Sequence, residues 1–312
     1  GPQQMDDRTA GKNGMGDAPP ADSGFSDPAG ASRSGKNPRL KWLVIAGLTL
    51  LSFVPAASIL ADTNFGPKTR EAPFPTRGPI SSPIQQIPEG EILVYDIYWL
   101  FFHVGIGQIR IQEKTLLDGR EVFHAVGKVR SNDFLSKIYP VEDIAESWID
   151  IHTFESLKFK KKTAEKGRHA DDQDTFDAPR LKGRHESFLT GLKKEFDISL
   201  LTHDILSAFY WVRRQELLPG RSFKMVLSVD QKDRTLEVDV LRHEMKNLPK
   251  HGTVDSILIE PKTRVNGVLQ KKGRAWIYLK NDGFRTPVYI KFETKFGAVT
   301  GVLRPSSPSR PR

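Results

Sequence analysis

The feature that most constrains this chain is an alternation of apolar and polar residues that runs, with few interruptions, from Glu89 to Leu303. In the stretch QIRIQ, for example, Ile109 and Ile111 share one face and the polar residues share the other. Successive side chains of a β-strand point to opposite faces of a sheet, so a period of two predicts strands with one buried face. We therefore expect a mainly β domain.

The clearest hairpin is RAWIYLKNDGFRTPVYIKFE, in which the residues NDG separate two alternating runs. Asn, Asp and Gly accept the positive φ angles of tight hairpin turns. Counting such runs gives about ten strands, which we expect to form a curved antiparallel sheet or half-barrel. The predicted turn residues are Gly105, Gly107, Asp282, Gly283 and Arg285.

One long helix is expected to cover this sheet, at SLLTHDILSAFYWVRRQELLPG, residues 199–220. Thr202 can cap its start, and Pro219 with Gly220 ends it. Its apolar stripe is broader than a helix on one sheet needs. The stripe residues are Leu201, Ile205, Leu206, Ala208, Phe209, Tyr210 and Val212. A second, short helix is predicted within SNDFLSKIY, residues 131–139.

An uncharged segment from Trp42 to Ala61 follows several basic residues and predicts export. Its apolar part is followed by Pro55, and Ala61 supplies a small residue for cleavage, as in a signal peptide. Its 20 residues also suffice for an uncleaved membrane anchor. Either alternative places the rest of the chain in the periplasm, free after cleavage or tethered to the inner membrane.

The regions around the alternating part differ from it in composition. Residues 1–41 are expected to be a disordered extension, 62–88 a proline-rich linker and 305–312 a disordered tail, which leaves 89–304 for a single domain. The chain has no cysteine. This excludes a disulfide scaffold, a lipidated cysteine, a cysteine nucleophile and cysteine-based metal sites.

The stretch IYWLFFHVGIGQIRI, residues 97–111, becomes more apolar toward an expected hairpin bend, and both faces of its strand are apolar. One interpretation is a central strand covered by the long helix. The other is a strand that lines a hydrophobic cavity between sheet and helix, because half-barrels of this size can hold a ligand. The candidate ligand-binding residues are then Trp99, Phe101, Phe102, Val104, Phe209 and Tyr210.

A basic stretch, KFKKKTAEKGRH, occupies residues 158–169 of a chain whose net charge is +9. It fits a solvated strand end with its hairpin tip, or a patch for anionic lipid headgroups. Nucleic acid is not expected as a partner, because Phe159 is the segment's only aromatic residue and the chain is expected to be exported. The candidate headgroup residues are Lys158, Lys160, Lys162 and Lys166.

No pattern in the sequence predicts catalytic residues, a cofactor or a metal site. The eight histidines lack the spacing of zinc ligands, and there is no nucleophile elbow, phosphate loop or dinucleotide motif. Asp143, Glu146 and Asp150 could serve as the paired carboxylates of a glycoside hydrolase. Asp143 and Glu146, however, face opposite sides of any strand that contains them.

Four fragments, taken in order, resemble an uncharacterised bacterial envelope family, domain of unknown function 3108. They are YDIYWLFFHVGIGQIRI, FLSKIYPVEDIAESWID, LTHDILSAFYWVR with LLPG, and WIYLKNDGFRTPVYI with FGAVTGVL, and they span about 89–304. The resemblance implies an outline similar to periplasmic lipoprotein carriers and other half-barrels that hold acyl chains, but no activity. The chain departs from usual members in its long preamble, its basic 158–168 segment and its Phe101-Phe102-His103 bend.

Together these features predict a non-catalytic envelope protein near a membrane that binds a hydrophobic, lipid-like or other amphipathic ligand between sheet and helix. Burial of an acyl chain would supply the affinity, at about 0.8 kcal/mol per methylene. The alternatives are an interaction or scaffold domain with an envelope protein partner, and an enzyme that acts on envelope glycans. No cofactor is expected.

Overall fold

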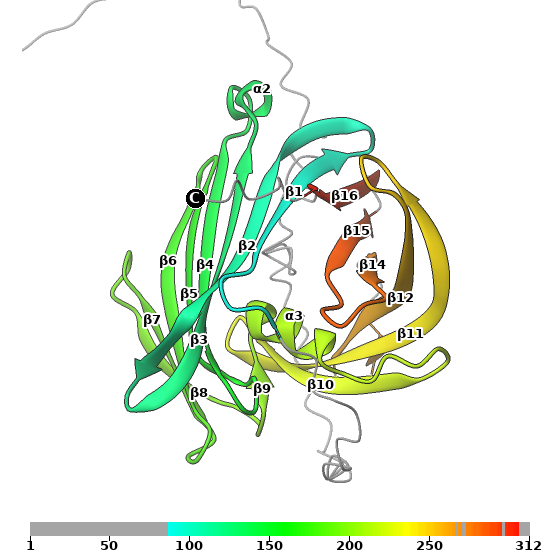
Figure 1. Cartoon of the computed structure of the whole chain (residues 1–312). Coiled ribbons are helices and arrows are strands. Elements are labelled where there is room, and N and C mark those ends of the chain that lie inside the picture. The colour runs from blue at the N-terminus through cyan, green and yellow to red at the C-terminus, as the bar shows by residue number, and fades with distance from the viewer. Residues whose placement is uncertain (1–86, 266–267, 270–272, 295–296, 306–312) are drawn as a thin grey trace, which may run out of the picture. The chain divides into compact units, whose positions relative to one another are not determined.

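The computed structural model of the chain describes residues 87–265, 268–269, 273–294 and 297–305 (Figure 1). The predicted extension, the hydrophobic segment 42–61, nearly all of the linker and most of the tail lie outside these residues. The described residues form sixteen strands and two helices. Neither of these helices has the length and hydropathy needed to cross a membrane.

The elements follow one another with short connections. The helices are α2 (Asp133–Ser136) and α3 (Ile205–Arg213). The strands are β1 (Ile92–Trp99), β2 (Phe102–Leu117), β3 (Arg120–Ser131), β4 (Val141–Asp150), β5 (Ser156–Glu165), β6 (Arg168–Asp177), β7 (Lys182–Ser187), β8 (Lys193–Asp197), β9 (Thr202–His203), β10 (Ser222–Val229), β11 (Lys232–Leu248), β12 (Gly252–Val265), β13 (Val268–Leu269), β14 (Arg274–Lys280), β15 (Pro287–Thr294) and β16 (Gly297–Leu303).

All strands belong to one sheet, in which two runs of neighbours meet at β1. One run proceeds in chain order from β1 to β8, and the other goes from β1 to β16 and back through β15, β14, β12, β11 and β10 to β9. The short β13 pairs with β12 off this path. The pairings are antiparallel except for that of β9 with β10. The sheet is not closed: β8 and β9 are its edges.

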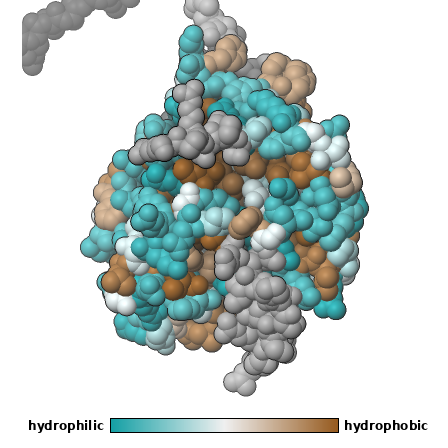
Figure 2. All heavy atoms as spheres, in the orientation of Figure 1, coloured by the Kyte–Doolittle hydropathy of each residue, from teal (hydrophilic) through white to brown (hydrophobic). Residues whose placement is uncertain are grey.

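The predicted alternation appears in the burial of individual strands. In β4 every second side chain is buried, from Val141 through Ala145 to Ile149, and the residues between them are half-buried or exposed. The sheet therefore has an inner face that carries the core and an outer face that is mostly hydrophilic. Figure 2 shows apolar residues between hydrophilic ones at the centre of the side in view. The mainly β, antiparallel prediction is confirmed.

The sheet curves around α3, which contacts both of its halves (Figure 1). Leu206 and Tyr210 pack with side chains of β2, β3 and β4, including Phe123. Ala208 and Val212 pack with side chains of β10, β11, β12 and β14. A helix between two apolar surfaces needs apolar residues on most of its circumference, which accounts for the broad stripe seen in the sequence.

The prediction of one long helix was wrong, because α3 has only nine residues. The backbone of Asp204 is extended and its carboxylate accepts the N–H groups of Leu206 and Ser207, so the helix begins after it. Thr202 therefore lies in β9, and the predicted stripe residue Leu201 is exposed outside the helix. The short helix predicted within 131–139 is confirmed as α2, although it spans only four residues.

The estimate of about ten strands was too low, because several strands lack a clear apolar period. β6 reads RHADDQDTFD, and Phe176 is its only fully buried residue. Such a strand is held by backbone pairing with β5 and β7, which leaves little trace in the residue pattern.

The predicted turn of the NDG hairpin is present between β14 and β15. The Asp282 carboxylate accepts the N–H groups of Phe284 and Arg285 at 3.0 and 2.8 Å. Arg285 itself has a φ of 47°. Side-chain acceptors of this kind stabilise turns by replacing a backbone partner.

The prediction that Gly105 and Gly107 reverse the chain was wrong. Both lie inside β2, and the chain reverses earlier, at Leu100 and Phe101. Glycine is needed at 105 for another reason: a Cβ atom there would lie 2.3 Å from the carbonyl oxygen of Arg130 on β3.

Candidate ligand-binding cavity

The position of α3 is set by the residue that caps it. The hydroxyls of Ser147 on β4 and Ser156 at the start of β5 both donate to the Asp204 carboxylate at 2.5 Å. The side chain of Ser207 completes a capping box with the Asp204 N–H. Burial raises the pKa of Asp204. The same carboxylate therefore begins the helix and ties it to two strands of the inner face.

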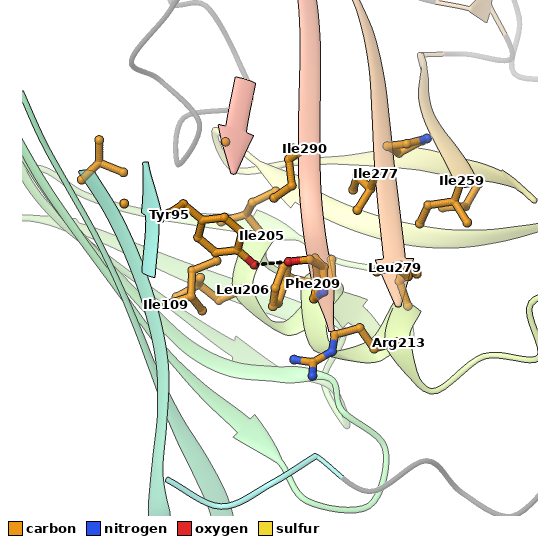
Figure 3. Close-up of a pocket in the computed structure, with 18 of the residues that line it drawn as sticks. Tyr95, Ile109, Ile205, Leu206, Phe209, Arg213, Ile259, Ile277, Leu279 and Ile290 are labelled. Atoms are coloured by element: carbon orange, nitrogen blue, oxygen red, sulfur yellow. Dashed lines mark hydrogen bonds between the residues drawn. The ribbon is translucent and has the colours of Figure 1, made fainter. Parts of the chain in front are cut away.

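A cavity of about 140 Å³ lies between α3 and the inner face of the sheet. Figure 3 shows Tyr95 and Ile109 on one side of it, Ile259 and Ile277 on the other, and Phe209 of α3 between them. Further lining side chains are Ile97, Val129, Ile205, Leu206, Val212, Leu227, Leu236, Val238, Leu279 and Ile290. The lining is mostly aliphatic and aromatic, which suits an apolar ligand, and its polar residues are Gln108, Lys128 and Arg213.

Two glycines enlarge the cavity because they stand where inward side chains would otherwise be. Gly301 on β16 lies opposite Ile97 in register, and both line the cavity. A Cβ atom on Gly301 would lie 3.8 Å from Tyr95 and 4.0 Å from Ile290, at ordinary contact distances. Gly107 on β2 also lines the cavity. The space is therefore a consequence of small residues in a curved sheet.

Arg213, the last residue of α3, is one of two cationic residues that line the cavity, the other being Lys128 on β3. The Arg213 guanidinium donates to both carboxylate oxygens of Glu91, at 2.7 Å each, and to the carbonyl oxygen of Phe284 at 3.0 and 3.2 Å. The two charged side chains are only 1% and 9% exposed. Burial and the Glu91 carboxylate act in opposite directions on the guanidinium, and its pKa is raised on balance. This bidentate pair seals the end of the cavity between α3 and the residues before β1.

Two buried tyrosines lie near this ion pair. The Tyr95 hydroxyl donates to the carbonyl oxygen of Pro287 at 2.9 Å, a bond that is dashed in Figure 3. The Tyr210 hydroxyl is fully buried and has no hydrogen-bond partner among the described residues. Burial raises the pKa of both phenols far above the usual range. Tyr210 therefore has a free polar atom close to the charged end of the cavity, since the Arg213 guanidinium lies 5.4 Å from its ring.

The six candidate ligand-binding residues lie in three different places. Phe209 lines the cavity, and Tyr210 is buried beside it on α3. Val104 and the half-buried Trp99 belong to a separate core cluster under α2. Phe101 and Phe102 are exposed at the β1–β2 turn and do not line this cavity. At this turn the chain between β1 and β2 exposes apolar side chains to water.

The four candidate headgroup lysines do not line the cavity. Lys158, Lys160 and Lys162 are on the face of β5 opposite to the inward Phe159. Lys158 lies over the ring of Trp148 at 4.4 Å, and Lys166 at the β5–β6 turn donates to the carbonyl oxygen of Ile138 at 2.7 Å. They form an outer basic strip rather than the rim of the cavity.

The three carboxylates considered for glycan hydrolysis do not converge. Asp143 is buried on the inner face, and burial together with the Glu165 carboxylate raises its pKa to about 6. Glu146 faces the other side and binds His124 at 2.9 Å, while Asp150 accepts N–H groups of the following turn. Within the described part of the chain, no group of three or more His, Asp or Glu side chains is placed to hold a metal ion.

The sequence reasoning missed most of the cavity wall. Leu227, Ile259, Ile277 and Leu279 come from β10, β12 and β14, whose alternation is that of any core strand. No residue type distinguishes a side chain that faces a cavity from one that faces a filled core.

Comparison with known proteins gives one family match. The model of DUF3108, a family described as proteins of unknown function, matches residues 94–304. No curated protein matches the chain. Among solved structures, a β-barrel-like protein of the domain of unknown function DUF1849 from Brucella abortus is 8% identical, with 68% of this chain and 94% of that chain covered and a TM-score of 0.49. A protein from Bacteroides fragilis, named as an exported protein of YmcC-like fold, is 9% identical, with 70% and 95% covered and a TM-score of 0.27.

Proposed function

The chain belongs to the DUF3108 family, whose function is unknown, and from this premise we propose that its domain binds a hydrophobic or lipid-like ligand in the cavity between the sheet and α3. We further propose that the protein is exported to the cell envelope and acts there as a non-catalytic binding protein. The export proposal draws on the hydrophobic segment 42–61. The observation that carries the binding proposal is the mostly apolar lining of the cavity.

The size of the cavity restricts the ligand. Its volume of about 140 Å³ is close to that of an engineered apolar cavity, about 150 Å³, that stays dry and binds benzene. One slender apolar group, such as part of an acyl chain, fits a space of this kind. Each buried methylene contributes about 0.8 kcal/mol, so a few methylenes supply measurable affinity.

The charged end of the cavity favours a ligand with one polar group. The Tyr210 hydroxyl has no partner among the described residues, and a buried hydroxyl without a partner costs free energy. Tyr210 does not itself line the cavity, but it lies next to Arg213, which does; we propose that a polar atom of the ligand at this end reaches the hydroxyl while the rest of the ligand stays in apolar surroundings. The proposed ligand class is therefore amphipathic, with a single polar head and a slender tail.

The proposal is tested by filling the cavity from Gly301. The Cβ atom of a leucine at position 301 would lie at ordinary contact distances from its neighbours. The rest of the leucine side chain would extend into the space that the ligand needs. We expect native mass spectrometry of protein from its own host to show bound lipid, and Gly301→Leu to weaken binding of a fluorescent fatty acid. The loss of about two methylene contacts, about 1.6 kcal/mol, corresponds to roughly a tenfold weaker affinity.

Gly301→Ala is the matched control, because one methyl group at ordinary contact distance leaves most of the space open. It should bind the probe nearly as the unchanged protein does, and both variants should keep the urea midpoint. The absence of co-purified lipid together with no probe binding would contradict the proposal. If Gly301→Leu binds the probe as tightly as the unchanged protein does, the ligand does not bind in this cavity.

The interaction-domain alternative has an observation of its own, the exposed phenylalanines at 101 and 102. It expects a photo-activatable group at position 101 to cross-link to an envelope protein in intact cells, with the cavity playing no part. A cross-link of that kind without lipid in the cavity would favour this alternative.

A further inference from the structure

Five large apolar side chains are exposed at one end of the sheet, on the β1–β2 turn and on and just after α2. We refer to them as the apolar tip. Phe101 is 77% exposed and Phe134 is 74% exposed. Figure 1 shows α2 and the β1–β2 turn at the same end. The members of the apolar tip are Leu100, Phe101, Phe102, Phe134 and Ile138.

The two parts of the apolar tip are held together. The Asn132 side chain donates to the carbonyl oxygen of His103 at 2.6 Å, and the Asn132 N–H donates to that of Val104 at 2.9 Å. Beneath them, Val104 packs with Leu135 and Tyr139 in one core cluster. The exposed side chains therefore project from a fixed base.

The β1–β2 turn has a leucine, Leu100, in a backbone conformation that leucine seldom adopts. Leu100 has a φ of 56°, a conformation in which Gly, Asn and Asp are favoured and a branched side chain is rare. Its N–H donates to the carbonyl oxygen of Ala298 at 2.7 Å. Leu181 and Leu201 have similar φ angles, so the conformation of Leu100 alone assigns no role; what distinguishes this turn is that Leu100 is followed by two exposed phenylalanines.

Two lysines lie next to the part of the apolar tip formed by α2 and Ile138. Lys137 ends α2, and Lys166 reaches it from the β5–β6 turn through its bond to Ile138. Among the described residues, no acidic side chain forms an ion pair with either lysine. Arg168 pairs with Glu165 at 3.4 Å, and Asp133 is the exposed acid of α2.

We propose that the apolar tip docks on the surface of an anionic lipid bilayer. The five apolar side chains enter the boundary between headgroups and acyl chains, and Lys137 and Lys166 lie at the level of the lipid phosphates. Apolar insertion and attraction to anionic lipids add in binding of this type. The surface is separate from the cavity, so it does not depend on the ligand proposed above.

A bilayer fits this surface better than a protein partner does. The side chains come from two separate elements, with the rings of Phe101 and Phe102 in contact at 4.3 Å between centroids, and a protein partner would have to offer an apolar surface that matches this arrangement. The hydrocarbon of a bilayer accepts any arrangement of apolar groups that reaches it. Two lysines without acidic partners suit a surface covered with phosphates.

The test needs a local readout, because the hydrophobic segment 42–61 can itself enter vesicles. The chain has no cysteine, so Phe101→Cys in the full chain takes a single polarity-sensitive NBD label. We expect its emission to shift to shorter wavelength on phosphatidylcholine vesicles that contain phosphatidylglycerol, and much less on phosphatidylcholine alone. The matched control is Leu116→Cys, an exposed leucine at the opposite end of β2, whose label should not respond.

Charge reversal tests the second part of the proposal. Lys137→Glu with Lys166→Glu should weaken the response of the label at position 101 by at least about tenfold in lipid concentration. Both lysines are exposed, so the fold should be kept.

The proposal would be overturned by the absence of a response at position 101 on anionic vesicles, or by an equal response at position 116. Cross-linking of position 101 to a protein without a vesicle response would also overturn it, in favour of a protein partner. The Gly301→Leu variant should keep the vesicle response, which separates a failure here from a failure of the cavity proposal.

Discussion

The ion pair between Arg213 and Glu91 joins the end of α3 to the residues that enter β1. Its geometry is bidentate, with both N–O distances at 2.7 Å. The guanidinium also donates to the carbonyl oxygen of Phe284 between β14 and β15. Three segments that are far apart in the chain therefore meet at one buried cation, and its removal should affect the stability of the whole domain.

The expected magnitude follows from burial. With the two side chains only 1% and 9% exposed, water cannot replace a lost partner. Arg213→Met keeps much of the volume but leaves the Glu91 carboxylate buried and unpaired, and we expect a loss of about 3–5 kcal/mol in the free energy of unfolding. Glu91→Leu should cost a similar amount. The double variant removes both charges, so its loss should fall short of the sum by about 2–3 kcal/mol.

Urea unfolding of the full chain, followed by tryptophan fluorescence, measures these differences. Trp211 lies on α3, two residues before Arg213, and reports on the helix. The control is Lys114→Met, which breaks an ion pair with Glu89 of similar length, 2.9 Å, at the surface. Its urea midpoint should hardly change. A loss below about 1 kcal/mol for Arg213→Met, or additive effects in the double variant, would refute the reasoning.

Three further predictions concern single residues. The pKa of Asp143 is raised from 3.8 to about 6 in the folded protein, so the folded state binds this proton more tightly than the unfolded state does. The free energy of unfolding should therefore fall by about 3 kcal/mol at most as pH rises from 4 to 6. Asp143→Asn should remove this pH-dependent component in urea titrations at several pH values. Asp204→Ala should lower the free energy of unfolding by about 2 kcal/mol or more, since it removes the helix cap and the acceptor of Ser147; Asp204→Asn, which keeps an acceptor, should lose less. Gly183→Ala should destabilise by about 1–3 kcal/mol, because its Cβ would lie 2.3 Å from the Phe196 ring; an unchanged melting temperature would contradict this.

The strands that could be predicted from sequence are those with one clearly apolar face. β2 and β14 with β15 are examples, and the NDG turn between the last two was recognised from its residue types. β6 could not be recognised, because its residues are mostly polar on both faces. The length of α3 was overestimated for a similar reason: apolar residues continue before Asp204, but they belong to a strand and a loop.

The candidate site was predicted in its outline but not in its residues. An apolar space between sheet and helix was expected, and Phe209 lines a cavity between α3 and the inner face of the sheet. Phe101 and Phe102, chosen for the same site, are exposed at a turn instead. Hydrophobicity along a strand predicts contact with something apolar, but it does not say whether that is the core, a ligand or another surface.

The sequence by itself determined the class of this protein, because strand alternation, turn residues and the helix stripe are local properties that each short segment carries. It also determined the hydrophobic segment near the amino terminus and the absence of cysteine chemistry. Only the tertiary structure decided where the cavity lies and where the apolar bend points. The cavity depends on the curvature of one sheet, on α3 packed inside it and on Gly301 opposite Ile97. Such a space is the volume that the side chains of β1, β12, β14 and α3 leave unfilled. Its size depends on all of these elements together, so no single segment of the chain specifies it.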